Sequence, residues 1–376
     1  MRFIDCIDME LVKANENFDD GYYHLLKDII DYPDATIYVI WSQRGPGKTY
    51  SALWSSYYLH MPSMYMKRTN DDTHFLCNYS TIDGDNENDP SPYAPINEDK
   101  GINVKPVELE NGYGAFYNMN EDGEPEGAPV SYLASLNAIK KLKGISFRHV
   151  MLMFMDEFIP LAGERVMHKE GEWLLDLYMT ILRDRVKRGL PEIKLVLMAN
   201  SENISCPITR ELNLIDPIYD MLAEGKDIRY LDNRKILLHH LSSEEYPTLG
   251  TIEDLGIYAA TQGTAWNAKT FAGEFAANDF SMIARNKSIK RFTPEVSIKY
   301  KLEYMTVYRK NGRLHVCDKF DRNAPLYDLS SEADQMKFYT EYLLEYRFDI
   351  MDKNITFQKY SQYDLFRNYK NYYKVN

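Results

Sequence analysis

The sequence predicts an α/β fold built on a parallel sheet. Apolar runs of strand length alternate with helical segments over residues 1–205, and such alternation is typical of this fold class. A glycine-rich turn follows the first apolar run, and two acidic residues follow the next long one. Parallel strands end at the same edge of a sheet, so these residues are expected to share one ligand site.

Composition and charge exclude several classes of protein. The chain has 376 residues and a net charge of −12, which argues against a protein that coats nucleic acid with its whole surface but allows a local basic track. Its four cysteines are scattered without a C-x-x-C pair, which indicates a reduced, cytoplasmic protein without disulfides or a zinc site. With no long apolar run and no signal peptide, no membrane partner is predicted.

The first strand, predicted over 35–41, leads into the most informative segment of the chain. A helix is predicted directly after this segment, over 49–60. Glycines in such a turn let backbone N–H groups surround a phosphate, and the helix N-terminus faces the same anion. Lys48 would then reach the β- and γ-phosphates of a nucleotide, and the Thr49 hydroxyl would bind Mg²⁺. The segment consists of Ser42, Gln43, Arg44, Gly45, Pro46, Gly47, Lys48 and Thr49.

The segment departs from the usual phosphate-binding pattern at one position. The pattern G-x-x-x-x-G-K-[ST] begins with glycine, and this chain has Ser42 there. A plain glycine-rich turn between a strand and a helix is therefore the alternative interpretation.

The segments that follow extend the sheet. Residues 63–67 predict a second short strand, and the acidic, proline-rich insert 81–100 predicts a surface loop. Two short strands are expected around the Asn111-Gly112 turn, and a helix is predicted over 131–143.

Two further apolar runs end in polar residues. The run 150–155 predicts a buried parallel strand that closes on Asp156 and Glu157. Hydrolysis needs a metal anchor and a water-activating base, roles that suit Asp156 and Glu157 respectively. The strand predicted over 192–198 is followed by Asn200, which is expected beside the γ-phosphate. The alternatives are an exposed acidic turn and a polar strand cap.

Two basic clusters lie near these strands. Residues 183–188, with Arg183 and Arg185, end a helix predicted over 169–188, where cations favour the helix dipole. The functional interpretation is an arginine finger that supplies positive charge to a neighbouring active site. Lys143 and Arg148 belong to the other cluster, which could face a neighbouring nucleotide, DNA or only solvent.

The character of the sequence changes after residue 205. We expect a P-loop domain over 1–205, a linker subdomain over 206–248 and an α+β domain over 249–376. Strands are predicted at 280–284, 296–308 and 313–317 in the last domain. Its tail, 358–374, alternates aromatic and basic residues, which favours an amphipathic helix with an aromatic core face over nucleic-acid contact.

Taken in order, these motifs resemble the DNA-packaging ATPases (DNA encapsidation proteins) of phi29-like small tailed phages, relatives of large terminase subunits. The segment from Arg44 to Thr49 matches the R-G-x-G-K-[ST] loop of that family, and 64–68 (MYMKR) resembles its second strand. Residues 156–159 read D-E-F-I, as in the family's Walker B motif. Residues 182–185 and 198–201 resemble its F-R-N-R and L-S-N-A segments.

The resemblance implies a fold and a function. It implies a P-loop NTPase of the additional-strand, catalytic-glutamate type, then the linker and an RNase H-like domain. It also implies a homo-oligomeric ring, expected to have five members, that hydrolyses ATP with Mg²⁺ and drives double-stranded DNA into a prohead. The implied location is the host cytoplasm, at the portal (connector) vertex, with the portal or a structural RNA as a further partner.

The resemblance also assigns roles to individual residues. Arg183 falls at the finger position and Lys143 where the family has a lysine, while Arg44 would report the γ-phosphate. Arg185 and Arg148 stay open as finger candidates. The insert 81–100 has no counterpart in the family.

Two alternatives to a DNA motor remain at this point. One is a terminase-like protein with an active metal-dependent nuclease domain. Only Glu303 and Asp318 stand out as acids near the hairpin predicted in the last domain, so an inactive nuclease is expected. The other alternative is a scaffold that binds nucleotide without hydrolysing it.

Overall fold

The computed structural model describes residues 2–79, 91–161, 164, 166–183, 185–242, 244–246, 256–264, 266–267 and 278–373. The chain divides into two compact units. One consists of Met1–Leu212 with Met221–Ala276, and the other of Asn213–Asp220 with Ala277–Asn376. The predicted domain boundaries at 205 and 248 stay a prediction.

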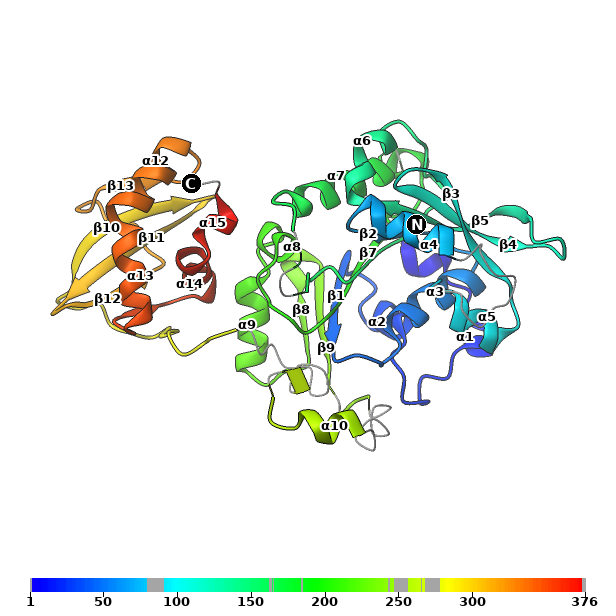
Figure 1. Ribbon diagram of the computed structural model, residues 1–376, viewed down its shortest axis with the longest axis horizontal. Coiled ribbons are helices and arrows are strands. Elements are labelled where there is room, and N and C mark those ends of the chain that lie inside the picture. The colour runs from blue at the N-terminus through cyan, green and yellow to red at the C-terminus, as the bar shows by residue number, and fades with distance from the viewer. Residues whose placement is uncertain are drawn as a thin grey trace. The chain divides into compact units, whose positions relative to one another are not determined.

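The first unit is built on a nine-stranded sheet in the order β3-β4-β5-β2-β6-β7-β1-β9-β8 (Figure 1). The strands from β5 to β9 in this order are all parallel, and antiparallel strands flank them on both sides. The predicted α/β class with a parallel sheet is thus confirmed. The strands are β1 (Ile37–Ser42), β2 (Ser63–Lys67), β3 (Val104–Glu110), β4 (Tyr113–Met119), β5 (Pro125–Ser135), β6 (Leu152–Asp156), β7 (Lys194–Asn200), β8 (Ile228–Leu231) and β9 (Ile236–Leu241).

Helices connect these strands. They are α1 (Met9–Asn15), α2 (Leu25–Asp31), α3 (Lys48–Tyr58), α4 (Asn70–Tyr79), α5 (Ala94–Lys100), α6 (Ile139–Leu142), α7 (Glu170–Leu182), α8 (Pro207–Glu211) and α10 (Gly256–Thr261), with α9 (Ile215–Ala223) belonging to both units. Within the described ranges, no helix is long and apolar enough to cross a bilayer.

Several predicted elements differ from the structure. The strand predicted at 280–284 is wrong, because Ile283 forms only an isolated bridge with Phe357 there. The strand predicted over 296–308 is also wrong as a single element, because the chain turns between Tyr300 and Glu303 and forms two antiparallel strands. The predicted helix 131–143 is wrong over its first part, because β5 runs to Ser135 and pairs in parallel with β2. The insert 81–100 is not a loop throughout, since Ala94–Lys100 form α5, and residues 80–90 lie outside the described part of the chain. The strands β8 and β9, within the predicted linker 206–248, extend the main sheet.

The second unit holds a five-stranded sheet in the order β13-β10-β11-β12-β14. Its strands are β10 (Thr293–Tyr300), β11 (Glu303–Lys310), β12 (Arg313–Cys317), β13 (Leu326–Asp328) and β14 (Ile355–Phe357), and its helices are α12 (Glu332–Phe338), α13 (Leu344–Met351), α14 (Tyr360–Arg367) and α15 (Tyr369–Tyr372). This sheet and its helices confirm an α+β arrangement. Its assignment to the RNase H-like class stays a prediction.

The aromatic residues of the C-terminal tail lie inside the second unit. Phe366 and Tyr369 are buried and pack against Phe338, and Tyr346 stacks on Phe366. The amphipathic helix predicted for the tail is therefore confirmed.

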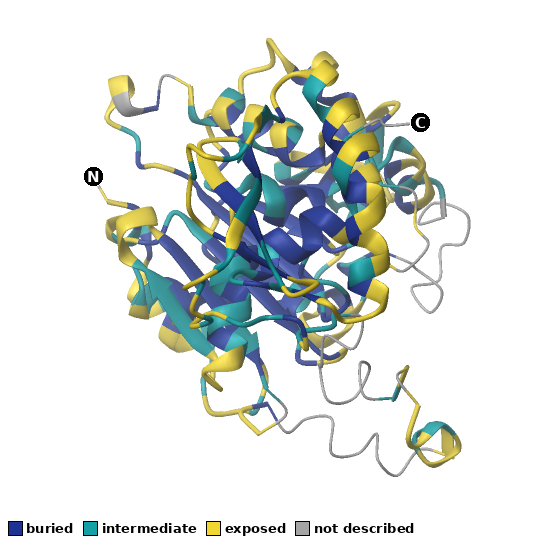
Figure 2. Cartoon of the chain, turned by 90° about the vertical axis from the view of Figure 1, so that its left-hand side faces the viewer, coloured by how far each residue is buried: buried dark blue, intermediate teal, exposed yellow. Residues whose placement is uncertain are grey.

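In Figure 2 the buried residues, dark blue, follow the strands and inner helix faces, while exposed residues, yellow, follow the outer helix faces.

Candidate functional site

The glycine-rich segment forms a tight loop between β1 and α3. Gly45 and Gly47 have φ of 102° and 89°, a left-handed conformation that other residues adopt only with strain. Gly47 is the N-cap of α3, so the free N–H groups of the first helical turn open toward the loop. This is the strand–loop–helix geometry that binds phosphates in other proteins.

The Lys48 ammonium is hydrogen-bonded to oxygen atoms of the protein itself. Its ammonium donates to the Ser42 hydroxyl, to the Gln43 carbonyl oxygen at 3.3 Å and to Asn200 Oδ1 at 3.4 Å. Burial lowers the pKa of Lys48 to about 8, although Asp156 works in the opposite direction. A buried cation at the bottom of the loop is well placed to attract a phosphate chain.

A hydroxyl and a carboxylate meet beside this lysine. Thr49 Oγ1 donates to Asp156 Oδ2 at 2.9 Å, and the buried Tyr65 hydroxyl donates to the same oxygen at 3.2 Å. Mg²⁺ prefers oxygen ligands and is usually held by one or two carboxylates together with phosphate oxygens. Thr49 and Asp156 fit such an ion. Among the described residues, no group of three or more His, Cys, Asp or Glu forms a metal cluster.

Glu157 and Asn200 lie at the same edge of the sheet. Asn200 ends β7 and is in register with Ser42 of β1, and Asp156 ends the adjacent β6. Glu157 is exposed and has φ of 55°, which turns its side chain away from the line of the strand. Such strain in a non-glycine residue is common at active sites.

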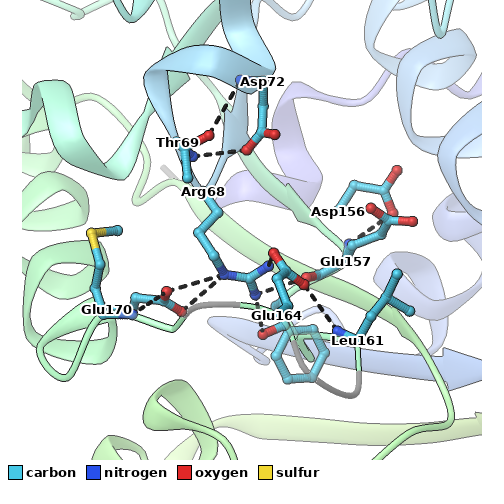
Figure 3. Close-up of polar contacts among 10 residues, drawn as sticks. Arg68, Thr69, Asp72, Asp156, Glu157, Leu161, Glu164 and Glu170 are labelled. Carbon is cyan, nitrogen blue, oxygen red and sulfur yellow. Dashed lines mark hydrogen bonds and ion pairs between the residues drawn. The ribbon is translucent and has the colours of Figure 1, made fainter.

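A buried arginine fixes the main chain at Glu157. Arg68, which follows β2, donates through Nη2 to the Glu157 and Phe158 carbonyl oxygens at 3.1 and 3.2 Å. Figure 3 shows its guanidinium between Glu164 and Glu170, with ion pairs of 2.7 and 3.1 Å. Burial raises the pKa of the Glu170 carboxyl, and Arg68 opposes this shift. The strand end that carries Glu157 is therefore held in place by Arg68.

Sequence reasoning missed the roles of Arg68 and Tyr65. Tyr65 lies in the second strand and Arg68 directly after it. Only the family resemblance points to basic residues at the end of this strand. A reciprocal cap between Thr69 and Asp72 (Figure 3) starts α4 directly after Arg68 and so fixes its main chain.

The remaining residues of the loop differ in burial. Gln43 is fully buried, and neither polar atom of its carboxamide has a partner among the described residues. Arg44 is exposed on the loop, and Pro46 accepts a hydrogen bond from the Tyr23 N–H at 2.9 Å. That bond connects the loop to the segment before α2.

Among the described residues, no hydrogen bond or ion pair joins the predicted finger residues Lys143 and Arg183 to the glycine-rich loop. Lys143 follows α6, is exposed and pairs with Asp176 at 3.3 Å. Arg183 is the exposed C-cap of α7, and its neighbour Asp184 lies outside the described residues. Arg183 and Arg148 are among the residues that line a hollow of about 90 Å³.

The side chain of Arg185 is buried and hydrogen-bonded to the main chain, which indicates a structural role. Its guanidinium is buried and donates to the carbonyl oxygens of Pro191 at 2.8 Å, Arg148 at 2.7 Å and Val150 at 2.9 Å. Burial lowers the pKa of this guanidinium. Because most of its donors bind main-chain oxygens, Arg185 joins the segments around Arg148 and Pro191, whereas Arg183 has no hydrogen bond or ion pair from its side chain among the described residues.

We expect Arg185→Leu to destabilise the first unit. Three carbonyl oxygens would lose their buried donor, which should lower the free energy of unfolding by about 3 kcal/mol. All four tryptophans (Trp41, Trp54, Trp173 and Trp266) belong to this unit, so urea unfolding followed by tryptophan fluorescence reports on it. The exposed Arg188→Leu is the control and should shift the midpoint little; equal midpoints for both variants would contradict the structural role.

The acids considered for a nuclease have a lysine partner. In the second unit, Lys359 Nζ lies 2.6 Å from Asp318 and 3.6 Å from Glu303. Asp318 raises the pKa of Lys359 against the effect of burial. The inactivity of this domain as a nuclease stays a prediction.

The chain was compared with known proteins. No protein-family model and no curated protein matches it. Two solved structures share its fold over nearly the whole length. A structure of the bacteriophage phi29 viral genome packaging motor assembly matches with a TM-score of 0.58 at 15% identity, covering 93% of this chain and 99% of that one. A structure of the phi28 DNA packaging motor matches with a TM-score of 0.59 at 15% identity, covering 95% and 99%. The resemblance inferred from the sequence is therefore confirmed at the level of the fold.

Proposed function

We propose that this chain is an ATPase subunit of a viral DNA-packaging motor. The observation that carries the proposal is the convergence of Lys48, the Thr49–Asp156 pair, Glu157 and Asn200 at one edge of the parallel sheet. Ligands of open α/β sheets bind at this edge. The fold shared with packaging-motor structures agrees with this assignment.

Each residue of the site has a separate role in ATP hydrolysis. Backbone N–H groups of the loop and the Lys48 ammonium bind the phosphates of ATP, while Arg44 and Asn200 flank the γ-phosphate. Thr49 and Asp156 would hold Mg²⁺, which when bound would supply positive charge to the phosphate oxygens. Glu157 accepts a proton from the attacking water or orients it, and Arg68 keeps Glu157 at its strained strand end.

A neighbouring subunit supplies the remaining charge. Arg183 is exposed at the end of α7, and Lys143 is exposed and, within the described part of the chain, forms an ion pair only with Asp176. Both can therefore reach a partner surface, as an arginine finger acting in trans must. We propose that the subunits form a homo-oligomeric ring of five, in which Arg183 completes the site of the next subunit and Lys143 assists.

The substrate moved by this ring is double-stranded viral DNA. The phi29 and phi28 structures are described as a viral genome packaging motor assembly and a DNA packaging motor. By analogy, we propose that this chain acts in the host cytoplasm at the portal vertex of a prohead. The second unit would dock on the portal or on a structural RNA.

Lys48→Ala tests the proposed nucleotide site. Loss of the buried ammonium should weaken binding of a fluorescent ADP or ATP analogue by about 100-fold or more, because a charged donor to phosphate is lost. Fluorescence titration of the purified full chain measures this. The exposed Lys13→Ala, which breaks only a surface pair with Glu10, is the control. Unchanged nucleotide affinity in Lys48→Ala would reject the site.

A further inference from the structure

Ser42 occupies the position where the phosphate-binding pattern has glycine. It ends β1 and is fully buried. Its hydroxyl donates to the Gln43 carbonyl oxygen and accepts a hydrogen bond from the Lys48 ammonium. A glycine here could make neither contact. The serine at this position therefore adds one oxygen atom of the protein that accepts a hydrogen bond from Lys48, the lysine proposed to bind phosphate.

The Lys48 ammonium has a complete set of protein partners. An ammonium group carries three N–H donors, and Ser42, Gln43 and Asn200 each provide one acceptor. The hydroxyl of Ser42 uses its own proton for Gln43, so its lone pairs are left to face Lys48. A phosphate oxygen can bind this ammonium only by displacing at least one of the three acceptors.

We propose that Ser42 is a positioning residue that holds Lys48 on the protein side of the loop and thereby weakens nucleotide binding. The inference rests on the proposed function, because Lys48 must be the residue that binds phosphate. Ser42 has no exposed surface, so in this arrangement a phosphate cannot bind the Ser42 hydroxyl while Lys48 also binds it. The contact competes with the ligand. It also favours release of the product nucleotide, because Lys48 has a ready partner when it leaves the phosphate.

Removal of the Ser42 hydroxyl should therefore strengthen nucleotide binding. In Ser42→Ala one N–H of the buried ammonium loses its partner, and a phosphate oxygen then satisfies it without displacing an acceptor. We expect the Kd for a fluorescent ADP analogue to fall about tenfold and the dissociation rate to fall with it. Ser42→Gly, which restores the usual motif, should change both in the same direction.

Ser201→Ala is a matched control. Ser201 is also fully buried, and its hydroxyl donates to the Ser42 carbonyl oxygen at 3.3 Å, but the hydrogen bonds of Lys48 to described residues do not include Ser201. Its loss should leave the Kd within about twofold of the wild type. Thermal unfolding of each variant tests whether the protein remains folded. Ser42→Gly serves as the second test if Ser42→Ala is unstable.

Titrations of the full chain and its variants separate the possible outcomes. Tighter binding and slower release in Ser42→Ala and Ser42→Gly, with Ser201→Ala unchanged, support the inference. Unchanged or weaker binding in both Ser42 variants overturns it, since the hydroxyl would then be neutral or would hold Lys48 in its phosphate-binding position. In that case the Lys48→Ala result still stands for the site itself. Nucleotide affinity that does not depend on Lys48 would overturn both proposals.

Discussion

Replacing Glu157 with glutamine is expected to lower ATP turnover by roughly 10²–10⁴-fold, the usual contribution of a general base. The amide keeps the size of the side chain but cannot accept the proton of the attacking water. Arg68 holds the main chain at Glu157, so the strand end should keep its conformation in the variant. Nucleotide affinity should therefore change by no more than about twofold, because no proposed phosphate contact is lost.

Steady-state phosphate release and nucleotide titration distinguish these two effects. Glu172→Gln is the matched control, because Glu172 is exposed on α7 and pairs only with Lys169 among the described residues. Its turnover should equal that of the wild type. A Glu157→Gln variant with undiminished turnover would show that another group activates the water.

The second large effect is expected from Arg183→Ala. An arginine finger contributes about 10³–10⁵-fold to phosphoryl transfer, so the variant should lose ring-dependent hydrolysis while each subunit still binds nucleotide. Arg188→Ala is the control, since Arg188 is exposed and lines the same hollow but is not the proposed finger. The assay requires assembled motors, because the proposed finger acts across a subunit interface.

Mixing the two inactive variants tests action in trans directly. An Arg183→Ala subunit still has Glu157, and a Glu157→Gln subunit still has Arg183. When they assemble together, some interfaces combine an intact Glu157 with an intact Arg183, and activity should return at those interfaces. Mixed motors without any recovered activity would contradict a finger supplied by the neighbour.

The parts of the site that follow apolar runs could be predicted from the sequence. Asp156 and Asn200 each end a buried strand, and Lys48 follows β1 across the glycine-rich loop; parallel strands bring such ends together. Arg68 could not be assigned in this way. Its partners, Glu164 and Glu170, lie in another part of the chain, and no local spacing indicates that they surround one guanidinium.

The errors in the fold have a similar origin. The segment around Leu133 is short and apolar, and periodicity alone cannot separate a buried strand from a helix of that length. The segment forms a strand because it pairs with β2 on one side and with β4 on the other; β4 directly precedes β5 in the chain, but β2 is distant in sequence. The position of β9 beside β1, which also brings its neighbour β8 into the sheet, depends on the same kind of long-range pairing.

The burial of Lys48 gives the loop an acid–base property of its own. With a pKa of about 8, this lysine is partly uncharged in mildly alkaline solution, unlike a lysine in water. A bound phosphate chain favours the charged form and so raises the pKa. Nucleotide binding near pH 8 therefore takes up protons from the solvent, and nucleotide release returns them. We therefore expect a small proton uptake on nucleotide binding that grows as the pH rises from 7 toward 8, and calorimetry in buffers of different ionisation enthalpy measures it.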